Sequence, residues 1–188
     1  MTEKQRLRKI FLDMRAQMPE EEIYYKSQFI YEKLIHSSLY HQCKMIFTYV
    51  SMGNEVDTKK VILRGLLDRK IIAVPKVNPK KKEMIFSKIK SLDELEAGHF
   101  NVLEPREDCI QPIESNQETL ILVPGAVFGR DKNRIGYGGG YYDRYLSSVK
   151  GALKIIGLGY DFQLIDKIPS DPYDVPLDTI VTDKGWIK

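Results

Sequence analysis

Short apolar runs, each of four to seven residues, recur through the sequence after residue 44 and constrain its fold most strongly. They cover residues 45–50, 71–77, 84–89, 120–123 and 153–158. Runs of this length are typical of buried strands. Between the first two lie residues 58–70, whose apolar side chains recur at helical spacing. Because a strand, a helix and a strand in this order favour a parallel pair, the sequence predicts an α/β fold: a three-layer sandwich with a mainly parallel central sheet flanked by helices.

Two helices are expected before the first strand. Thr2 and Gln5 match a capping box, and the apolar residues that follow fall on one helical face. That expected face consists of Leu7, Ile10, Phe11 and Met14. Pro19, followed by three glutamates, favours the start of a second helix that ends near residues 36–38.

The later part of the chain is predicted from its turn residues. Residues 78–82 (Asn-Pro-Lys-Lys-Lys) suit a hairpin turn between two strands, residues 104–118 suit a loop, and residues 141–149 suit a helix. A chain of 188 residues with 43% hydrophobic composition is long enough for one well-packed core. We therefore expect residues 1–188 to form a single domain.

Charge and cysteine usage restrict the classes of partner. The 29 Lys and Arg residues barely exceed the 26 Asp and Glu residues, so the net charge of +3 creates no general field for nucleic acid. Cys43 and Cys109 lack metal-ligand spacing and are expected to be reduced thiols. The N-terminal residues lack an apolar signal core, and no apolar run reaches the roughly 18 residues of a membrane span. These features favour a soluble cytoplasmic protein that contacts neither nucleic acid nor a membrane.

A stretch rich in glycine, arginine and tyrosine at residues 129–144 resembles a polyphosphate cradle. Four of its glycines lie within five positions, where they let backbone N–H groups approach an anion. These glycines are Gly136, Gly138, Gly139 and Gly140. Arg130, Lys132 and Arg134 supply positive charge, and the stretch is expected to join the strand at 120–125 to a helix N-terminus, which favours anions. It matches neither the P-loop nor the dinucleotide-binding fingerprint.

Two other interpretations of this stretch stay open from the residues alone. One is a flexible turn with its arginines in solvent. The other is a binding module that uses the Arg/Gly/Tyr segment to hold single-stranded nucleic acid, which ordinarily needs a longer basic groove and several stacking platforms.

Two aspartates are candidate metal ligands. Asp143 falls in the first turn of the helix after the glycines, where it could simply stabilise the helix dipole, and Asp174 lies in a proline-rich loop near the C-terminus. Mg²⁺ typically takes one or two protein carboxylates together with phosphate oxygens and waters. Both aspartates are therefore candidates for a Mg²⁺ site completed by a phosphate ligand.

Several motifs together are similar to those of the 5-formyltetrahydrofolate cyclo-ligase family, also called 5,10-methenyltetrahydrofolate synthetases. In chain order they are Lys4-x-x-x-Arg8, Tyr49–Thr58, Val74-Pro-Lys76, Leu122–Phe128, Arg134–Arg144, Gly159–Gln163 and Asp174–Asp178. Their order and spacing, over nearly the whole chain, carry the resemblance.

The resemblance implies an ATP-dependent ring closure of 5-formyltetrahydrofolate to 5,10-methenyltetrahydrofolate, with release of ADP and phosphate. It implies that ATP phosphorylates the formyl oxygen, which makes that oxygen a leaving group when N10 attacks the carbon. A sugar-phosphate isomerase or an acyl-CoA transferase on a similar α/β sheet would be the rival enzyme, and neither needs ATP. A monomeric protein with small-molecule substrates is expected.

The resemblance also implies a role for individual residues. Arg134 would be catalytic and stabilise the γ-phosphoryl group in transfer, and Asp143 and Asp174 would hold Mg²⁺. The implied ATP contacts are Lys4, Arg8, Arg134, Ile135, Gly136, Tyr137, Gly138, Gly139, Gly140, Tyr141 and Tyr142. The implied folate contacts are Val50, Glu55, Tyr137, Gly138, Gly139, Gly140 and Tyr141.

At two positions this chain departs from the family that it resembles. Some members have a lysine within the glycine run, where this chain has Gly139, and many have a histidine before the aspartate that corresponds to Asp174, where this chain has Tyr173. If the lysine's charge is needed, it must come from Lys4, Arg8, Lys132 or Arg134.

Overall fold

The computed structural model describes residues 1–187, except for the side chain of Phe100. The helices are α1 (Glu3–Ala16), α2 (Glu20–Ile35), α3 (Ser38–Gln42), α4 (Lys59–Leu67) and α5 (Tyr141–Ser148). The strands are β1 (Met45–Thr48), β2 (Ile71–Asn78), β3 (Glu83–Ile89), β4 (Leu95–Ala97), β5 (Leu103–Pro105), β6 (Thr119–Val123), β7 (Val127–Gly129), β8 (Arg134–Ile135), β9 (Lys154–Leu158), β10 (Leu164–Ile165), β11 (Thr179–Thr182) and β12 (Gly185–Ile187). The short 3-10 helices are η1 (Leu92–Glu94), η2 (His99–Asn101), η3 (Glu107–Cys109) and η4 (Asp161–Gln163).

The central sheet has seven strands in the order β12-β11-β9-β6-β1-β2-β3. The strands from β11 to β2 run parallel, and only the edge strands β12 and β3 are antiparallel to their neighbours. The expected strand–helix–strand unit is β1-α4-β2, and β2 then pairs with β3 through the expected hairpin, in which Asn78 faces Glu83. All five predicted strands are present, and the predicted α/β fold is confirmed.

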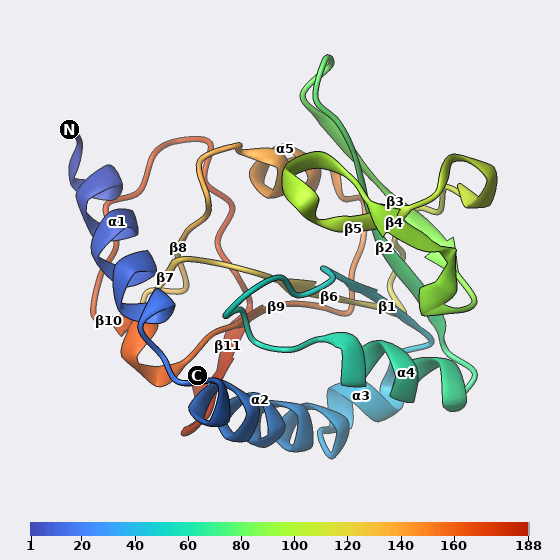
Figure 1. The fold of residues 1–188 in the computed structure, drawn as a ribbon, viewed down its shortest axis with the longest axis horizontal. Coiled ribbons are helices and arrows are strands. Elements are labelled where there is room, and N and C mark those ends of the chain that lie inside the picture. The colour runs from blue at the N-terminus through green and yellow to red at the C-terminus, as the bar shows by residue number, and fades with distance from the viewer. Residues whose placement is uncertain (188) are drawn as a thin grey trace.

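The two faces of this sheet are covered by different elements (Figure 1). Helices α2, α3 and α4 lie along one face, where Leu34, Tyr40 and Ile62 pack with residues of β1, β6 and β9. Helix α5 lies against the other face, where Leu146 packs in a cluster with Phe47 and Phe86. The sheet is therefore the middle of three layers, because both of its faces are apolar and both must be buried.

Beside the main sheet lies a three-stranded sheet in the order β10-β7-β8, against which α1 packs (Figure 1). The prediction of which residues form the apolar face of α1 is partly wrong. Leu7 and Phe11 do pack on this small sheet, but Ile10 and Met14 are exposed, and Leu12 is partly buried instead. The face of α1 that turns inward also carries Lys4, Arg8 and Arg15, which contact residues of the C-terminal loop and of the glycine-rich stretch.

Some shorter elements were not predicted. The segment expected to be a loop, residues 104–118, begins with the end of β5, and its Pro112 forms an isolated bridge to Ser87 at the free edge of β3. The C-terminal segment adds β11 and β12 to the main sheet. None of the helices within residues 1–187 is long and apolar enough to cross a membrane.

Candidate functional site

The glycine-rich stretch leads from β8 into α5. The predicted junction with a helix N-terminus is correct, but the strand that precedes it belongs to the small sheet rather than being the central strand β6. Gly138 and Gly140 have φ angles of +103° and +65°, which residues other than glycine rarely adopt. Gly140 is the residue immediately before the first turn of α5. We call residues 136–140 the glycine loop.

Two arginines from different elements approach Gly136. The Arg8 Nε of α1 donates to the carbonyl oxygen of Gly136 at 2.7 Å. The Arg134 guanidinium lies so close that a Cβ at position 136 would be 2.8 Å from its Nη1. A side chain at position 136 would therefore displace the Arg134 guanidinium from its place beside the loop.

Arg134 is buried within the site, with 5% of its surface exposed. Its Nη2 donates to the Asp143 carboxylate of α5 at 3.0 Å, and its guanidinium carbon lies 5.6 Å from the centre of the Tyr142 ring. The interpretation of this arginine as a solvated surface residue is excluded. A buried guanidinium that is planar and always charged is suited to binding phosphate oxygens.

Two buried polar atoms beside the glycine loop have no hydrogen-bond partner among the residues described. They are the Nε of Arg134 and the hydroxyl of Tyr142. Burial raises the pKa of Tyr142, so its phenol keeps its proton at neutral pH. Unpaired buried polar groups are costly in a folded protein, and both of these can donate to an oxygen atom of a ligand.

Lys4, one turn before Arg8 on α1, contacts the C-terminal loop instead of the glycine loop. Its ammonium forms ion pairs with Asp171, at 2.7 Å, and with Asp174. Burial alone would lower the pKa of Lys4, but its hydrogen bonds to Asp171 and Asp174 together raise it. These contacts bring Asp174, distant in sequence, to the helix that also holds the glycine loop.

On its other side the glycine loop contacts the segment that follows β1. The Tyr137 phenol lies near the Glu55 carboxyl and lowers its pKa, and the Glu55 carboxylate accepts a hydrogen bond from the backbone N–H of Met52 at 2.9 Å. Burial raises the pKa of Glu55, while Tyr137, Met52 and the positive charge of Arg15 oppose that rise. Glu55 is thus a partly buried acceptor whose ionised form is supported by its neighbours.

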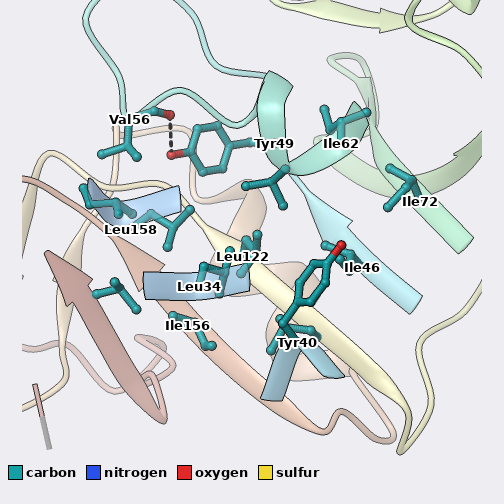
Figure 2. Close-up of a cluster of buried hydrophobic side chains, with 14 of the residues drawn as sticks. Leu34, Tyr40, Ile46, Tyr49, Val56, Ile62, Ile72, Leu122, Ile156 and Leu158 are labelled. Atoms are coloured by element: carbon teal, nitrogen blue, oxygen red, sulfur yellow. Dashed lines mark hydrogen bonds between the residues drawn. The ribbon is translucent and has the colours of Figure 1, made fainter. Parts of the chain in front are cut away.

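The segment that carries Glu55 is fixed from the core side. The Tyr49 hydroxyl donates to the carbonyl oxygen of Val56 at 3.0 Å, above the cluster of buried side chains in Figure 2. The Tyr160 hydroxyl donates to the carbonyl oxygen of Glu55 at 3.1 Å. Val50 is buried in the same core, with 2% of its surface exposed. The carboxylate of Glu55 therefore extends from a rigid support.

The remaining loop residues are held by Arg144 of α5. Its Nη2 donates to the carbonyl oxygen of Gly139 at 2.8 Å, and its guanidinium carbon lies 5.1 Å from the centre of the Tyr141 ring. Ile135 packs into the apolar cluster with α1, so only its backbone faces the loop. Arg130, by contrast, lies on the surface and pairs with Asp166 at 3.7 Å. Its predicted charge is not part of the cradle.

The protein side chains near the glycine loop could hold a Mg²⁺ ion only if a bound phosphate supplied further oxygen atoms. Within residues 1–187 there is no group of three or more His, Cys, Asp or Glu side chains that could hold a metal ion. Asp143 and Asp174 each face a cation, Arg134 and Lys4 respectively. Because Mg²⁺ needs only one or two carboxylates when phosphate and water supply the other oxygens, either aspartate has the chemistry to hold a metal that arrives with a phosphate ligand.

The structure thus connects most of the predicted site residues through α1 and the glycine loop. Sequence reasoning missed Arg15, Arg144 and Tyr160, which touch the site through Tyr137, Gly139 and Glu55. Helical spacing could have indicated Arg15, because it lies seven residues after Arg8 and so on the same face of α1.

Several known proteins are similar to this chain over most of its length. The sequence profile of the 5-formyltetrahydrofolate cyclo-ligase family matches residues 1–183. A 5-formyltetrahydrofolate cyclo-ligase of Mycoplasma pneumoniae is 34% identical over 184 residues, which cover 97% of this chain and 99% of that protein. The mitochondrial 5-formyltetrahydrofolate cyclo-ligase of Arabidopsis thaliana is 31% identical over 184 residues, which cover 84% of this chain and 66% of the plant protein.

A solved structure agrees with this match. The NMR structure of the Aquifex aeolicus 5,10-methenyltetrahydrofolate synthetase has a TM-score of 0.86 and 31% sequence identity, and the alignment covers 98% of this chain and 92% of that chain.

Proposed function

This chain belongs to the 5-formyltetrahydrofolate cyclo-ligase family, and we propose that it converts 5-formyltetrahydrofolate and ATP into 5,10-methenyltetrahydrofolate, ADP and phosphate. One observation supports this function most directly. Adjacent residues of the glycine loop face two different surroundings: Gly136 lies between Arg8 and Arg134, and Tyr137 reaches Glu55. The reaction needs this arrangement, since the γ-phosphate of ATP must meet the formyl oxygen of the folate.

The chemistry requires two displacements. The formyl oxygen attacks the γ-phosphorus, an O–P bond forms, and the bond to the β-phosphate oxygen breaks to release ADP. N10 then attacks the formyl carbon, the C–O bond breaks with loss of phosphate, and N10 gives up its proton. Without phosphorylation the formyl oxygen is a poor leaving group, so the protein contributes mainly by positioning the reactants and stabilising their charge.

We assign the phosphate side of the site to the cationic residues. Arg134 is the catalytic residue: its unpaired Nε and its buried guanidinium are suited to hold the γ-phosphoryl group as charge develops on its oxygens. Arg8 and the neutral phenol of Tyr142 add donors beside it. The backbone of residues 136–140 forms the floor of this side.

We further propose that ATP binds as its magnesium complex. Asp143 and Asp174 would hold the ion, and Arg134 and Lys4 would transfer from these aspartates to phosphate oxygens as the complex binds. When bound, Mg²⁺ neutralises phosphate charge. The ion pairs of the free protein thus keep both sets of charges satisfied before the ligand arrives.

We assign the folate side to Glu55, Val50 and Tyr137. The Glu55 carboxylate can accept hydrogen bonds from the ring N–H and amino groups of the pterin. Val50 supports the segment from the core, and Tyr137, whose side chain is 44% exposed, offers ring surface next to the glycine loop. An aromatic side chain and an ionised acceptor together suit a flat heterocycle with several N–H donors.

We also propose that the chain acts as a monomer in the cytoplasm. All the residues assigned to the site come from one chain, and both Cys43 and Cys109 are free thiols, as is usual in a reducing compartment. Sedimentation velocity on the purified protein, with and without both substrates, tests the monomeric state.

The function is tested by mixing the purified protein with 5-formyltetrahydrofolate, ATP and Mg²⁺ and following the near-ultraviolet absorbance of the methenyl product. We expect product only when ATP is present, and none with an ATP analogue whose γ-phosphate cannot be transferred. An Arg134→Gln variant purified in parallel excludes activity from the expression host's own enzyme.

Two outcomes contradict the proposal. Equal product formation with and without ATP would indicate a different reaction. No product together with salt-sensitive binding of single-stranded nucleic acid would favour the alternative binding module.

A further inference from the structure

Arg15, in the last turn of α1, contacts the folate side of the site indirectly. Its Nη1 donates to the hydroxyl oxygen of Tyr137 at 2.7 Å, and its guanidinium carbon lies 5.4 Å from the centre of the same ring. Arg15 therefore both fixes the position of the Tyr137 ring and occupies an acceptor site on its hydroxyl oxygen.

The direction of the hydrogen bonds follows from the chemistry of a phenol. A hydroxyl group has one proton to donate. Because the guanidinium of Arg15 can only donate, the proton of Tyr137 is free for its other partner, the carboxylate of Glu55. Arg15, Tyr137 and Glu55 are thus arranged so that the phenol can accept from Arg15 and donate to Glu55.

Both ends of this arrangement are anchored through the backbone. The Asn54 side chain donates to the carbonyl oxygen of Arg15 at 2.9 Å and so ties the end of α1 to the residue before Glu55. The backbone N–H of Met52 fixes one oxygen of the Glu55 carboxylate. The geometry is thus set in the free protein, which lowers the cost of ordering these groups when a ligand binds.

A direct Arg15–Glu55 ion pair would serve a substrate less well. No such pair lies within 4 Å in the part of the chain that the structure describes. A guanidinium in direct contact would occupy both carboxylate oxygens in a bidentate pair and compete with the N–H groups of a ligand. Acting through Tyr137, the positive charge supports the carboxylate while leaving acceptor capacity open.

We propose that Arg15 is a positioning residue for folate binding, which holds Tyr137 beside Glu55 so that the carboxylate is aimed at the N–H groups of the pterin. This inference rests on the proposed function for the identity of the ligand. The arrangement of the three side chains can be tested in the free protein as well.

The first test measures how Glu55 titrates without any ligand. The protein is labelled with ¹³C at the glutamate side-chain carboxyl carbon, and Glu55→Gln identifies the signal. Arg15→Gln is expected to raise the pKa of Glu55, because it removes a positive charge that now lowers it. Arg6→Gln, which removes the same charge from an exposed position of the same helix, is expected to leave it unchanged.

Other ionisable groups also face Glu55, and their state must be constant during the titration. They are Arg15, Tyr49, Tyr137, Tyr142 and Tyr160. The tyrosines all have raised pKa values and stay neutral below pH 9, so the shift in Arg15→Gln reports on the arginine alone.

The second test uses enzyme kinetics. Arg15→Gln is expected to raise the KM for 5-formyltetrahydrofolate about tenfold, the loss expected for one hydrogen bond of ordinary strength, with the KM for ATP unchanged. The acid limb of kcat/KM for the folate should move to higher pH. Arg15→Lys, which keeps the charge, should recover part of the affinity.

A double-mutant cycle decides whether Arg15 acts through Tyr137. If it does, Arg15→Gln combined with Tyr137→Phe costs no more folate affinity than the larger single change. Additive losses overturn the proposal, and so does an unchanged Glu55 titration in Arg15→Gln.

If Arg15→Gln fails to fold, Tyr137→Phe must produce the same rise in the pKa of Glu55. If the parent protein makes no product, the proposed function fails, but the titration still decides the arrangement of the three side chains.

Discussion

The two sides of the glycine loop hold charge differently. On the phosphate side, full opposite charges face each other: Arg134 contacts Asp143, and Lys4 contacts Asp171 and Asp174. On the folate side, the Glu55 carboxylate accepts from the neutral backbone N–H of Met52, and the cation Arg15 contacts the phenol of Tyr137 rather than Glu55 itself.

This difference matches the ligands proposed for the two sides. A magnesium nucleotide brings charges of both signs, so ion pairs of the protein can be exchanged for ion pairs with the ligand without leaving a buried charge unpaired. A pterin brings neutral N–H donors, which need an ionised acceptor with free lone pairs. A cation in direct contact with the carboxylate would keep it ionised, but would occupy the lone pairs that the pterin needs.

The largest effect is expected from Arg134→Lys on the phosphate side. A lysine ammonium keeps the charge but not the planar fork, so kcat should fall about 100- to 1000-fold, the range for loss of one preorganised donor. Steady-state kinetics measure this, and Arg130→Lys, on the surface, serves as the matched control. A rise in the KM for the folate with unchanged kcat would place Arg134 on the other side of the comparison.

Glu55→Gln is expected to affect the folate side alone. The KM of this variant for 5-formyltetrahydrofolate should rise about tenfold to a hundredfold, because a hydrogen bond to a charged group contributes roughly 1.5–3 kcal/mol. The KM for ATP should stay at the parent value. Isothermal titration with each substrate checks this separation, and weakened binding of both would mean that the two sides are not independent.

Asp143→Asn is expected to have a smaller effect, limited to the metal. The Mg²⁺ concentration for half-maximal activity should rise about tenfold and excess Mg²⁺ should restore part of the rate, as expected when one of its carboxylate ligands is lost. Binding of Mn²⁺, followed by electron paramagnetic resonance in the presence of ADP, gives a readout that does not depend on turnover. Identical metal dependence in variant and parent would remove Asp143 from the metal site.

The smallest effect is a dependence of stability on pH that arises from Glu55. Since burial raises its pKa above the ordinary value of 4.5, the folded protein binds more protons than the unfolded chain just above that pH. Stability should therefore fall as the pH rises through this window, by at most about 1.4 kcal/mol per pH unit for one group. Urea unfolding at several pH values should show this slope in the parent and a smaller slope in Glu55→Gln, which should also be more stable at pH 7.

Much of the fold could be predicted because it depends on local patterns. The runs that became β1 and β6 are buried along their whole length, as central strands covered on both faces must be, and β2 and β9 are buried over three consecutive residues. The edge strand β3 was recognisable from Met84, Phe86 and Ile89, which are buried, although Ile85 is exposed. Strands β7, β8 and β10 have only two or three residues each, too few for any pattern, and β10 pairs with β7 across more than thirty residues of sequence. Pairing of this kind is decided by the assembled structure.

The candidate site was predictable to a different extent on its two sides. The glycines, Arg134 and Asp143 lie within ten consecutive residues, so their association could be inferred from the sequence itself. Arg15, Glu55 and Tyr137 come from three distant segments. No spacing rule connects them, and only the docking of α1 against the small sheet brings them together.

By itself, the sequence determined the central parallel sheet, the glycine loop before α5, and the family, because these depend on residue types at short spacing. The tertiary structure decided which face of α1 turns inward. Apolar periodicity favoured Ile10 and Met14, yet both are exposed, while Lys4, Arg8 and Arg15 face carboxylates, carbonyl oxygens and a phenol. A helix orients by the sum of its contacts, and polar contacts from distant segments are invisible until those segments have folded against it.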